Sequence, residues 1–394
     1  MTTFRQAADA GYLELVKLWQ GGKAFEPIDR AGGGCFWMAG NTLQVAIDYL
    51  VQTGQNDKDN FMIDALDFFD RKVKDENPKN WKNDKIWMDD YGWWGVILAK
   101  AYQYSKELGY DNNQPVKQKI ARYAKNCWIG MHEAWDTSEM PNTDPNVKIT
   151  GGIANIIDAN TPKMSGRNCV TNELYWLLSL LLVEVMKDKS FLDPLTDEEK
   201  WFESAIRQCV LANANNLVLE RFKGVPNHTN PNVDGLYWIG DQGLFMGCCE
   251  ANARYGTGEL GMLAAYNIAA AVKQNMTLKG LVLHEDLFQL TEFQLDYAGG
   301  KGVFIRNLQV LNARSHGEQG DNYDPLIKAN AAAVWNHRLA DDKFRYFWNA
   351  EAKEPADWGY NKSVSDAVVH ASGLSAMTAA LPWFANQEIA PAQL

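Results

Sequence analysis

Amphipathic helical periodicity runs through the whole chain, and strand-like alternation is scarce. Apolar residues recur with the three- and four-residue spacing of helices in roughly twelve segments. We predict helices near 3–20, 41–53, 59–76, 92–108, 114–131, 172–188, 196–219, 242–255, 258–275, 303–314, 322–340 and 364–380. A chain of this kind must bury its apolar stripes by packing helix against helix.

The links between these segments alternate in length. The link after each even-numbered segment is short and ends in turn residues, as in "TGQNDKDN", "LGYDNNQP" and "YGTGEL". The link before each even-numbered segment is long and rich in Gly, Asn, Asp and aromatic residues, as in "KNWKNDKIWMDDYG" and "RFKGVPNHTNPNVDGLYWIGD". This alternation predicts six helical hairpins, each with an inner and an outer helix, that close into an all-α (α/α)6 barrel. All long links then lie on one face, at the N-termini of the inner helices.

No Pro- or Ser-rich linker divides the chain, so we predict that residues 1–394 form one catalytic domain. The alternative is a helical protein of two domains. The start "MTTFRQAADAGYLELVKLW" lacks the basic and apolar pattern of a signal peptide. The apolar stretch "LYWLLSLLLVEVM" is interrupted by Glu184 and is shorter than a bilayer requires. We therefore expect a soluble protein, cytoplasmic as sequenced, or secreted or periplasmic if a leader has been removed.

The charge and the aromatic content narrow the class of partner. A formal net charge of −11 argues against nucleic acid and anionic membranes as partners, and favours a neutral ligand. The 15 Trp and 15 Tyr suit both helix cores and sugar-binding sites, because their rings combine apolar area with a polar edge. This composition is compatible with an oligosaccharide or polysaccharide substrate without requiring one, and we expect a monomeric protein.

The cysteines and histidines give no sign of a metal site. No CxxC occurs, and neither the six Cys nor the six His have metal-ligand spacing. Cys248 and Cys249 lie inside an apolar helical pattern and are most simply small core residues. We predict no metal and no cofactor.

The segment "WMDDYGWWG", residues 87–95, places two carboxyl groups among aromatic side chains. A purely structural interpretation makes Asp90 an N-cap or first-turn residue, with Asp89 as its solvated neighbour. Three features favour a functional interpretation. The pair falls on the face of the long links, Trp87, Tyr91 and Trp93 flank it, and a helix N-terminus stabilises an ionised carboxylate.

Two carboxyl groups in different protonation states are what glycosidic cleavage requires. One acts at the anomeric carbon as an anion, and the other carries a proton to the departing oxygen. Two carboxylates in one site cannot both ionise freely, so proximity itself separates their pKa values. Adjacent residues converge on one bond only where the backbone is irregular, so we expect Asp89 and Asp90 in a loop that ends at a helix start. A distance of about 5 Å between the two carboxyl groups would predict a retaining reaction, and a larger distance would predict an inverting reaction.

Other motifs on the same face have structural explanations as well. "GGGCFWMAGN" has no Walker lysine and is not a phosphate loop. "RNCVTNELYW" offers Asn168 as a helix cap, "GDQG" offers Asp241, and Arg306 in "GGKGVFIRN" can pair with a carboxylate inside the barrel. Because all these motifs are expected on the same face of the barrel, we favour a functional role for them. The candidate substrate-binding residues are Trp37, Trp87, Tyr91, Trp93, Asn172, Tyr237, Trp238, Asp241, Gln242 and Arg306.

The motifs together resemble glycoside hydrolase family 76, the endo-α-1,6-mannanases. Asp89-Asp90 followed by Trp93-Trp94 is similar to the family's DD pair and tryptophan pair. "GGIANIIDANTPKMSGRNCVTNEL", "GDQGLFMG" and "GGKGVFIRNLQVL" resemble three further blocks of the family, in the same order. The likeness extends over about residues 35–380.

This resemblance implies an (α/α)6 barrel and a retaining hydrolase that acts on the α-1,6-linked mannose backbone of mannans. It implies Asp89 as the nucleophile and Asp90 as the general acid/base. Two departures concern the substrate and endo or exo action more than hydrolysis itself. Ala154 and Asn155 stand where the family usually has tryptophan, so a sugar-stacking surface would be lost, and Asp241 replaces an asparagine.

Two other functions remain open at this point. A sugar epimerase or isomerase of the same barrel type would need paired general bases, commonly histidines, facing the sugar. A non-catalytic carbohydrate-binding protein would bind oligosaccharides even after Asp89→Asn and would release no product.

Overall fold

Helices make up almost all of the regular secondary structure in the described residues. The computed structural model describes residues 1–19, 36–83, 86–139, 149–155, 167–197, 200–202, 217–220, 237–255, 260–278, 281–285, 295–315, 322–349 and 362–391. Its α-helices are α1 (Phe4–Trp19), α2 (Phe36–Thr53), α3 (Phe61–Lys72), α4 (Met88–Gln103), α5 (Gln114–His132), α6 (Cys169–Met186), α8 (Ile239–Asn252), α9 (Met262–Asn275), α10 (Gly300–Ser315), α11 (Asp324–Asn336) and α12 (Lys362–Phe384).

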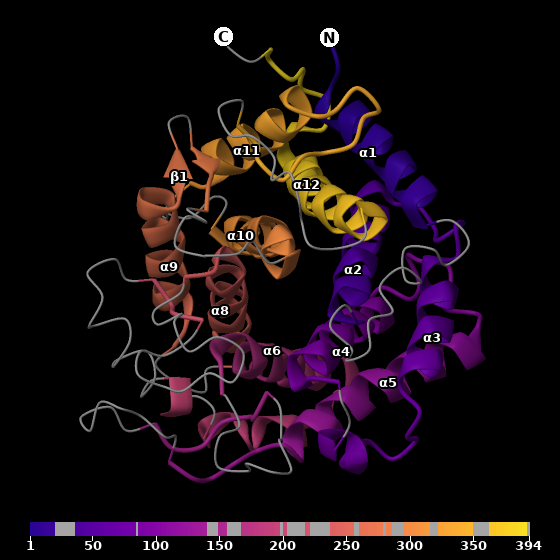
Figure 1. Ribbon diagram of the computed structural model, residues 1–394, viewed down its shortest axis with the longest axis vertical. Helices are drawn as coiled ribbons and strands as arrows, with labels where there is room; N and C mark the ends of the chain where they lie inside the picture. Colours follow the sequence, from indigo (N-terminus) through magenta and orange to yellow (C-terminus); the bar gives the residue numbers. More distant parts are fainter. Residues whose placement is uncertain are drawn as a thin grey trace.

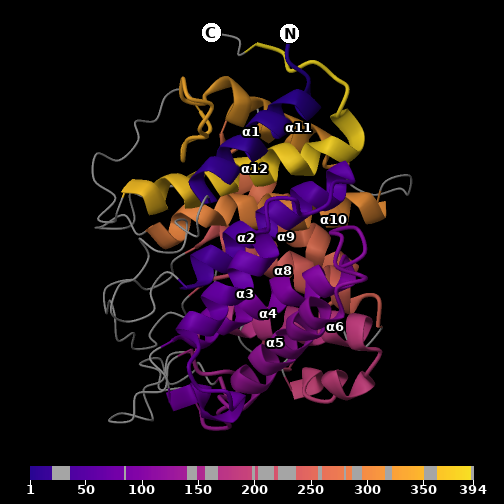
Figure 2. The same ribbon diagram turned by 90° about the vertical axis from the view of Figure 1, so that its right-hand side faces the viewer.

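The even-numbered helices form an inner ring. Each of α2, α4, α6, α8, α10 and α12 packs against the next, and α12 packs against α2 to close the ring (Figure 1). The helices α1, α3, α5, α9 and α11 lie outside it (Figures 1 and 2). The all-α (α/α)6 barrel predicted from the alternating links is therefore confirmed. The predicted segment 196–219 falls mostly outside the described residues, and its described end, residues 217–219, is not helical.

The inner helices all begin at the same end of the ring. Contacts join the first turns of neighbouring inner helices there, for example the backbone N–H of Trp37 in α2 and the carboxyl group of Asp90 in α4. At the opposite end, Gln103 and Arg254 both bond Glu184 at the end of α6. We call the first of these ends the N-terminal end of the inner ring.

The inner helices are buried on nearly all sides. All but the last three residues of α6 are buried. With 18 residues and a mean hydropathy of 1.4, α6 is long and apolar enough to cross a membrane. Inside the ring this same composition serves packing, because α6 contacts α4, α5 and α8.

Among the described cysteines, Cys127, Cys169, Cys248 and Cys249 are buried free thiols, so the expected core position of Cys248 and Cys249 is confirmed.

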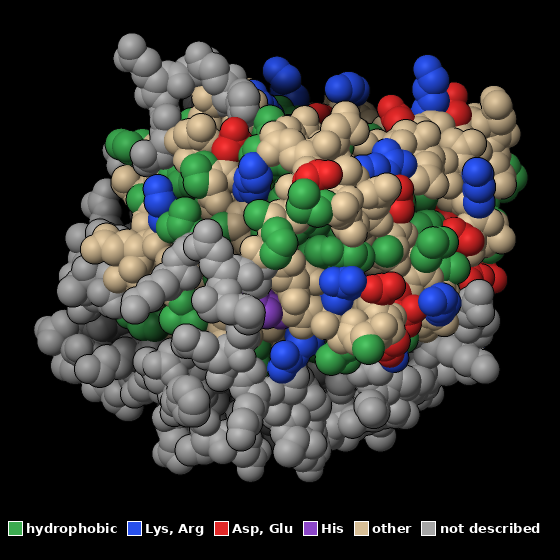
Figure 3. Space-filling view, turned by 90° about the horizontal axis from the view of Figure 1, so that it is seen from above, with side chains coloured by type: hydrophobic (Ala, Val, Ile, Leu, Met, Phe, Trp, Pro, Cys, Tyr) green, Lys and Arg blue, Asp and Glu red, His purple; other side chains and the backbone are tan. Residues whose placement is uncertain are grey.

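Strands contribute little within the described ranges. β1 (Thr277–Leu278) and β2 (Val282–Leu283) form a short antiparallel pair between α9 and α10. Short 3-10 helices occur at η3 (Pro78–Asn83), η5 (Lys189–Leu192) and η7 (Leu295–Gly299). On the face that carries the chain termini, described acidic and basic side chains are interspersed among apolar ones (Figure 3).

Candidate active site

Asp89 and Asp90 lie in the first turn of α4, at the N-terminal end of the inner ring. The expectation that they occupy an irregular loop is wrong, because α4 begins at Met88. Two carboxyl groups that act on one bond would therefore have to approach it from the first turn of a regular helix. The extended residue Trp87 precedes the helix as its N-cap and makes no side-chain cap bond. In a helix, consecutive side chains point about 100° apart, so the two carboxyl groups reach different partners.

Asp90 faces α2 and is 4% exposed. Its Oδ1 accepts a hydrogen bond of 2.8 Å from the backbone N–H of Trp37. This N–H belongs to the first turn of α2, where no intrahelical acceptor exists, so Asp90 also caps a neighbouring helix.

Asp89 faces the segment before α6 and is half-buried. Its Oδ1 accepts from the backbone N–H of Asp90 at 2.9 Å, and its Oδ2 accepts from Nδ2 of Asn155 at 3.3 Å. The Oδ1 of Asn155 in turn accepts from the backbone N–H of Asp89 at 3.3 Å. The two carboxyl groups thus have different surroundings although they are adjacent in sequence.

Aromatic side chains form a row beside this pair. The indoles of Trp37 and Trp93 lie 5.3 Å apart between ring centroids, and Trp93 meets Trp238 edge-on at 6.4 Å. Tyr297 continues the row from Trp238, again edge-on at 6.4 Å. The structure therefore brings together three predicted substrate-binding residues from α2, α4 and the start of α8. Tyr297 was missed, because a lone tyrosine in a long link carries no local signal.

Two glycines before Lys301 make room for this row. A Cβ on Gly299 would lie 3.3 Å from the Trp37 indole, and one on Gly300 would lie 2.5 Å from Nε1 of Trp238. Larger residues would push the indoles out of place. The "GG" of "GGKGVFIRN" is thus explained by packing against the aromatic row.

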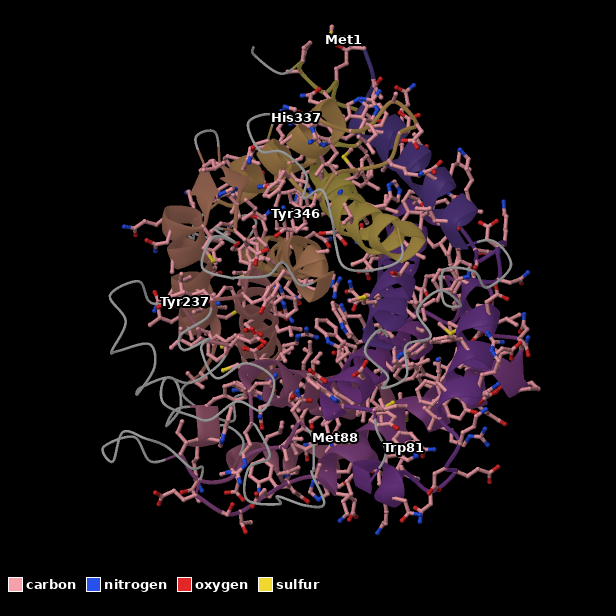
Figure 4. All side chains as sticks on the ribbon, in the orientation of Figure 1. Met1, Trp81, Met88, Tyr237, His337 and Tyr346 are labelled. Carbon is pink, nitrogen blue, oxygen red and sulfur yellow. The ribbon has the colours of Figure 1, made fainter. Side chains whose placement is uncertain are left out.

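The other predicted aromatic residues differ in position. Trp87 and Tyr237 are half-buried and lie next to the starts of α4 and α8. The ring of Tyr91 is fully buried and stacks on Trp81 at 4.5 Å, away from the aromatic row. Figure 4 marks Trp81, Met88 and Tyr237. The expectation that Tyr91 lies against a sugar is contradicted by this burial, because its ring packs between the inner and outer layers.

Two of the predicted substrate-binding residues, Asn172 and Gln242, form side-chain hydrogen bonds to backbone groups. Asn172 accepts from the N–H of Ile153 at 2.7 Å and donates to its carbonyl oxygen at 3.3 Å. Gln242 brackets Val218 in the same way, at 2.8 and 2.7 Å. Both side chains are fully buried, so each amide fixes a segment that precedes an inner helix. Whether either contacts a substrate stays a prediction.

Asp241 is fully buried in the first turn of α8, and the N-cap residue of that helix is Trp238. It lies near Glu173, whose pKa is raised well above its usual value by burial and by the charges of Asp241 and Glu220. Glu173 is completely buried, and neither of its carboxyl oxygens has a hydrogen-bond partner among the described residues. Burial and the neighbouring carboxylates thus favour the neutral form of this carboxyl group.

Glu285 caps α8 from a distant part of the chain. Its Oε1 accepts from the N–H of Ile239 at 2.8 Å, and its Oε2 accepts from the hydroxyl of Tyr346 at 3.2 Å. Burial raises the pKa of Glu285 to about 7, although these hydrogen bonds and nearby Lys301 oppose the shift. Sequence reasoning missed Glu285, because its partner is 46 residues away.

Arg306 lies inside the ring beside charged groups of α2 and α4. Burial lowers the pKa of Arg306 to about 10, against the charge of Asp48. Burial likewise lowers the pKa of Lys100 and raises that of Asp48, and the two charges oppose these shifts. Arg306 thus lies within electrostatic reach of Asp48, and whether it also contacts a substrate stays a prediction.

The described histidines are spread over unrelated contacts. His132 bonds the Tyr175 hydroxyl, His337 bonds the Trp348 carbonyl oxygen, His370 bridges α1 and α12, and His284 lies near Phe347. His228 and His316 lie outside the described residues. Within the described ranges, these contacts of the histidines give no support to the facing pair that an epimerase would require. No group of three described His, Cys, Asp or Glu residues could hold a metal ion.

Adjacent carboxyl groups beside a row of indoles, at one end of an (α/α)6 barrel, are an arrangement that suits the cleavage of glycosidic bonds. The sequence profile of glycosyl hydrolase family 76 matches residues 3–386. The chain therefore belongs to glycosyl hydrolase family 76, and the resemblance seen in its motifs is confirmed. The comparison with curated protein sequences gives no match.

Several solved structures share the fold. The chain is similar to an inactive variant of the α-1,6-mannanase GH76A of Salegentibacter sp. HEL1_6 in complex with α-1,6-mannotetrose, with a TM-score of 0.70, 17% identity, and coverage of 97% of this chain and 99% of that one. It is also similar to the Lin0763 protein of Listeria innocua (TM-score 0.68, 16% identity, coverage 96% and 97%). A third is Dfg5 of Chaetomium thermophilum in complex with glucosamine (TM-score 0.68, 14% identity, coverage 96% and 90%).

Proposed function

We propose that this protein is a retaining glycoside hydrolase that cleaves α-mannosidic linkages, specifically α-1,6 linkages, in mannan or manno-oligosaccharides. Asp89 would attack the anomeric carbon as the nucleophile. Asp90 would protonate the departing oxygen and then, as a base, activate the water that releases the product. The observation that carries the proposal is the different environment of two adjacent carboxyl groups at the N-terminal end of the inner ring.

The substrate class is supported by family membership and by one relative. The Salegentibacter α-1,6-mannanase binds α-1,6-mannotetrose as an inactive variant in which two consecutive aspartates are replaced. Asp89 and Asp90 are a consecutive pair in the first turn of an inner helix. The indoles of Trp37, Trp93 and Trp238 lie at the same end of the ring and are 8%, 3% and 6% exposed, so each offers a sugar only a small part of its apolar surface.

The reaction type can be tested by following hydrolysis of α-1,6-mannotetraose with proton NMR. We expect the newly formed reducing end to appear first as the α-anomer, because two displacements at the anomeric carbon retain its configuration. First appearance of the β-anomer would contradict the retaining mechanism. Absence of any cleavage of α-mannosides would contradict the proposed function.

The two roles can be separated with azide and an activated aryl glycoside of α-1,6-mannobiose. In Asp90→Ala the glycosyl-enzyme still forms, and azide should release the α-glycosyl azide. In Asp89→Ala azide should attack directly and give the β-glycosyl azide. The opposite assignment of products would exchange the two roles.

A further inference from the structure

Asn155 is fastened to the start of α4 by three hydrogen bonds. Its backbone carbonyl oxygen accepts from the N–H of Met88 at 2.8 Å. Its side chain then makes the reciprocal pair with Asp89, one bond to the backbone N–H and one to the carboxyl group. Asn155 is 6% exposed, so water competes little for these bonds. The direction in which the Asp89 carboxyl group points is therefore set from outside its own helix.

The polarity of these bonds favours an anion. The NH2 group of a side-chain amide can only donate, so Oδ2 of Asp89 is an acceptor. Oδ1 of Asp89 also accepts, from the N–H of Asp90 at 2.9 Å. Donors aimed at both oxygens stabilise the carboxylate over the protonated form. An ionised carboxylate is what nucleophilic attack requires.

The backbone that carries Asn155 is held in place. Ile153 is bracketed by the amide of Asn172 and bridges Trp135 in an antiparallel contact. Just before it, Gly151 and Gly152 have φ values of 86° and 99°, a left-handed conformation that favours glycine. This segment therefore presents Asn155 to Asp89 from a fixed support.

The geometry points to Asn155 as a positioning residue that keeps Asp89 oriented and ionised for attack. This inference rests on the proposed function, since it assigns Asn155 a part in the same reaction. Asn155 acts through Asp89. The titratable neighbour of Asp89 on α4 is Asp90, whose Oδ1 is bonded to the N–H of Trp37.

A purely structural role for Asn155 makes a different prediction. If Asn155 only caps α4, its side-chain oxygen matters and its NH2 group does not. Asn155→Asp separates the two, because it keeps an oxygen for the Asp89 N–H and replaces the donor with a second oxygen. Asn155→Ala removes both.

We expect Asn155→Asp to lower kcat on α-1,6-mannotetraose by about 10- to 100-fold, with a smaller change in KM, because a hydrogen bond to a charged group is lost. Asn155→Ala should show a similar loss. In the pH profile of kcat/KM, the acidic limb should move to higher pH by about one unit for Ala and by more for Asp. A wild-type kcat and acidic limb in Asn155→Asp would overturn the proposal.

Asn330 provides a matched control away from the aspartates. Its buried amide brackets a backbone segment in the same way, accepting from the N–H of Leu283 at 2.8 Å and donating to the carbonyl oxygen of Leu281 at 3.0 Å. Asn330→Ala and Asn330→Asp should lower the unfolding temperature without moving the acidic limb. An equal movement of the limb in the Asn330 variants would overturn the specific role of Asn155.

A readout independent of turnover keeps this inference separate from the proposed function. The carboxyl carbon of Asp89, assigned by comparison with Asp89→Asn, can be titrated by carbon-13 NMR. The pKa of Asp89 should rise in Asn155→Ala and further in Asn155→Asp, whether or not α-mannosides are cleaved. If Asn155→Asp does not fold, Asn155→Ser should show the rise instead. An unchanged Asp89 titration in the folded variants would contradict the inference.

Discussion

Glu173 shows how burial decides the ionisation of a single residue. Its side chain is completely buried, and Asp241 and Glu220 add like charge to the effect of burial on its pKa. A carboxyl group whose pKa is raised by folding favours the folded state at low pH. This contribution is lost as the pH rises from the ordinary value of 4.5 through the raised pKa of the folded state.

Glu173→Gln should therefore flatten the loss of stability toward alkaline pH. The neutral amide has nearly the shape of the protonated acid and cannot ionise. Unfolding temperatures measured from about pH 5 to about pH 9 should fall less for Glu173→Gln than for wild type. Glu107→Gln, which changes an exposed carboxylate, should follow the wild-type curve. Parallel curves for wild type and Glu173→Gln would show that Glu173 is not neutral in the folded protein.

The contacts of single residues are also the feature that the sequence predicts least well. Asn155 stands where a tryptophan was expected, and the sequence suggested only that a stacking surface is lost. Asn155 and Asp89 are 66 positions apart in the sequence, so no local sequence pattern could predict the hydrogen bonds between them. Tyr91 fails for a related reason. Its position beside the aspartates suggested contact with a sugar, but the helical phase turns its ring toward Trp81.

At the scale of elements, the helices were predictable and their starts were not. Apolar periodicity located the helices because each buries a stripe or a whole surface. Every inner helix begins earlier than predicted, for example α2 at Phe36 and α4 at Met88. The first turns contain glycines and acidic residues, which in the sequence alone are typical of loops. These turns are nevertheless helical, because carboxyl groups from elsewhere in the chain, such as those of Asp90 and Glu285, accept hydrogen bonds from their unpaired backbone N–H groups.

Two glycines inside inner helices should respond oppositely to alanine. A Cβ on Gly243 of α8 would lie 2.5 Å from the Cα of Phe304, so α8 and α10 would have to separate. Gly243→Ala should cost about 1–3 kcal/mol in unfolding free energy. The three atoms nearest to a Cβ on Gly40 of α2 all belong to the Trp94 indole, at 3.4 Å, and alanine favours helix. Gly40→Ala should be neutral or stabilising in denaturant unfolding, and equal losses in both variants would contradict this packing.

His370 ties α12 to α1 in its neutral form. Its Nδ1 accepts from the N–H of Phe344 at 3.0 Å, and its Nε2 bonds the carbonyl oxygen of Gly11 at 2.7 Å. Burial lowers its pKa to about 4. The folded state thus binds fewer protons than the unfolded state, and stability is lost as the pH falls from about 6.5 through about 4.

We expect His370 to account for about 3 kcal/mol of acid destabilisation between those pH values, because folding lowers its pKa from 6.5 to about 4. His370→Gln cannot take up the proton. It should be less stable than wild type at neutral pH but lose less stability on acidification, as measured by urea unfolding at several pH values. An identical acid slope in both proteins would exclude His370 as its source.

At the scale of the molecule, the closed inner ring explains why the site lies where it does. The first turns of the inner helices meet at one end, and this brings Asp89, Asp90 and the indoles of α2, α4 and α8 together. The far end is joined by ion pairs, such as Arg254 with Glu184 and Glu250. The alternation of link lengths was sufficient to predict this arrangement, because it depends on topology and not on any single contact.

The most direct test is turnover of α-1,6-mannotetraose by wild type, Asp89→Asn and Asp90→Asn, with thermal unfolding measured on the same samples. Wild type should release shorter manno-oligosaccharides. Both variants should stay folded and be slower by at least about 10²- to 10⁴-fold. Wild-type turnover in either folded variant would contradict the assignment of the reaction to this pair.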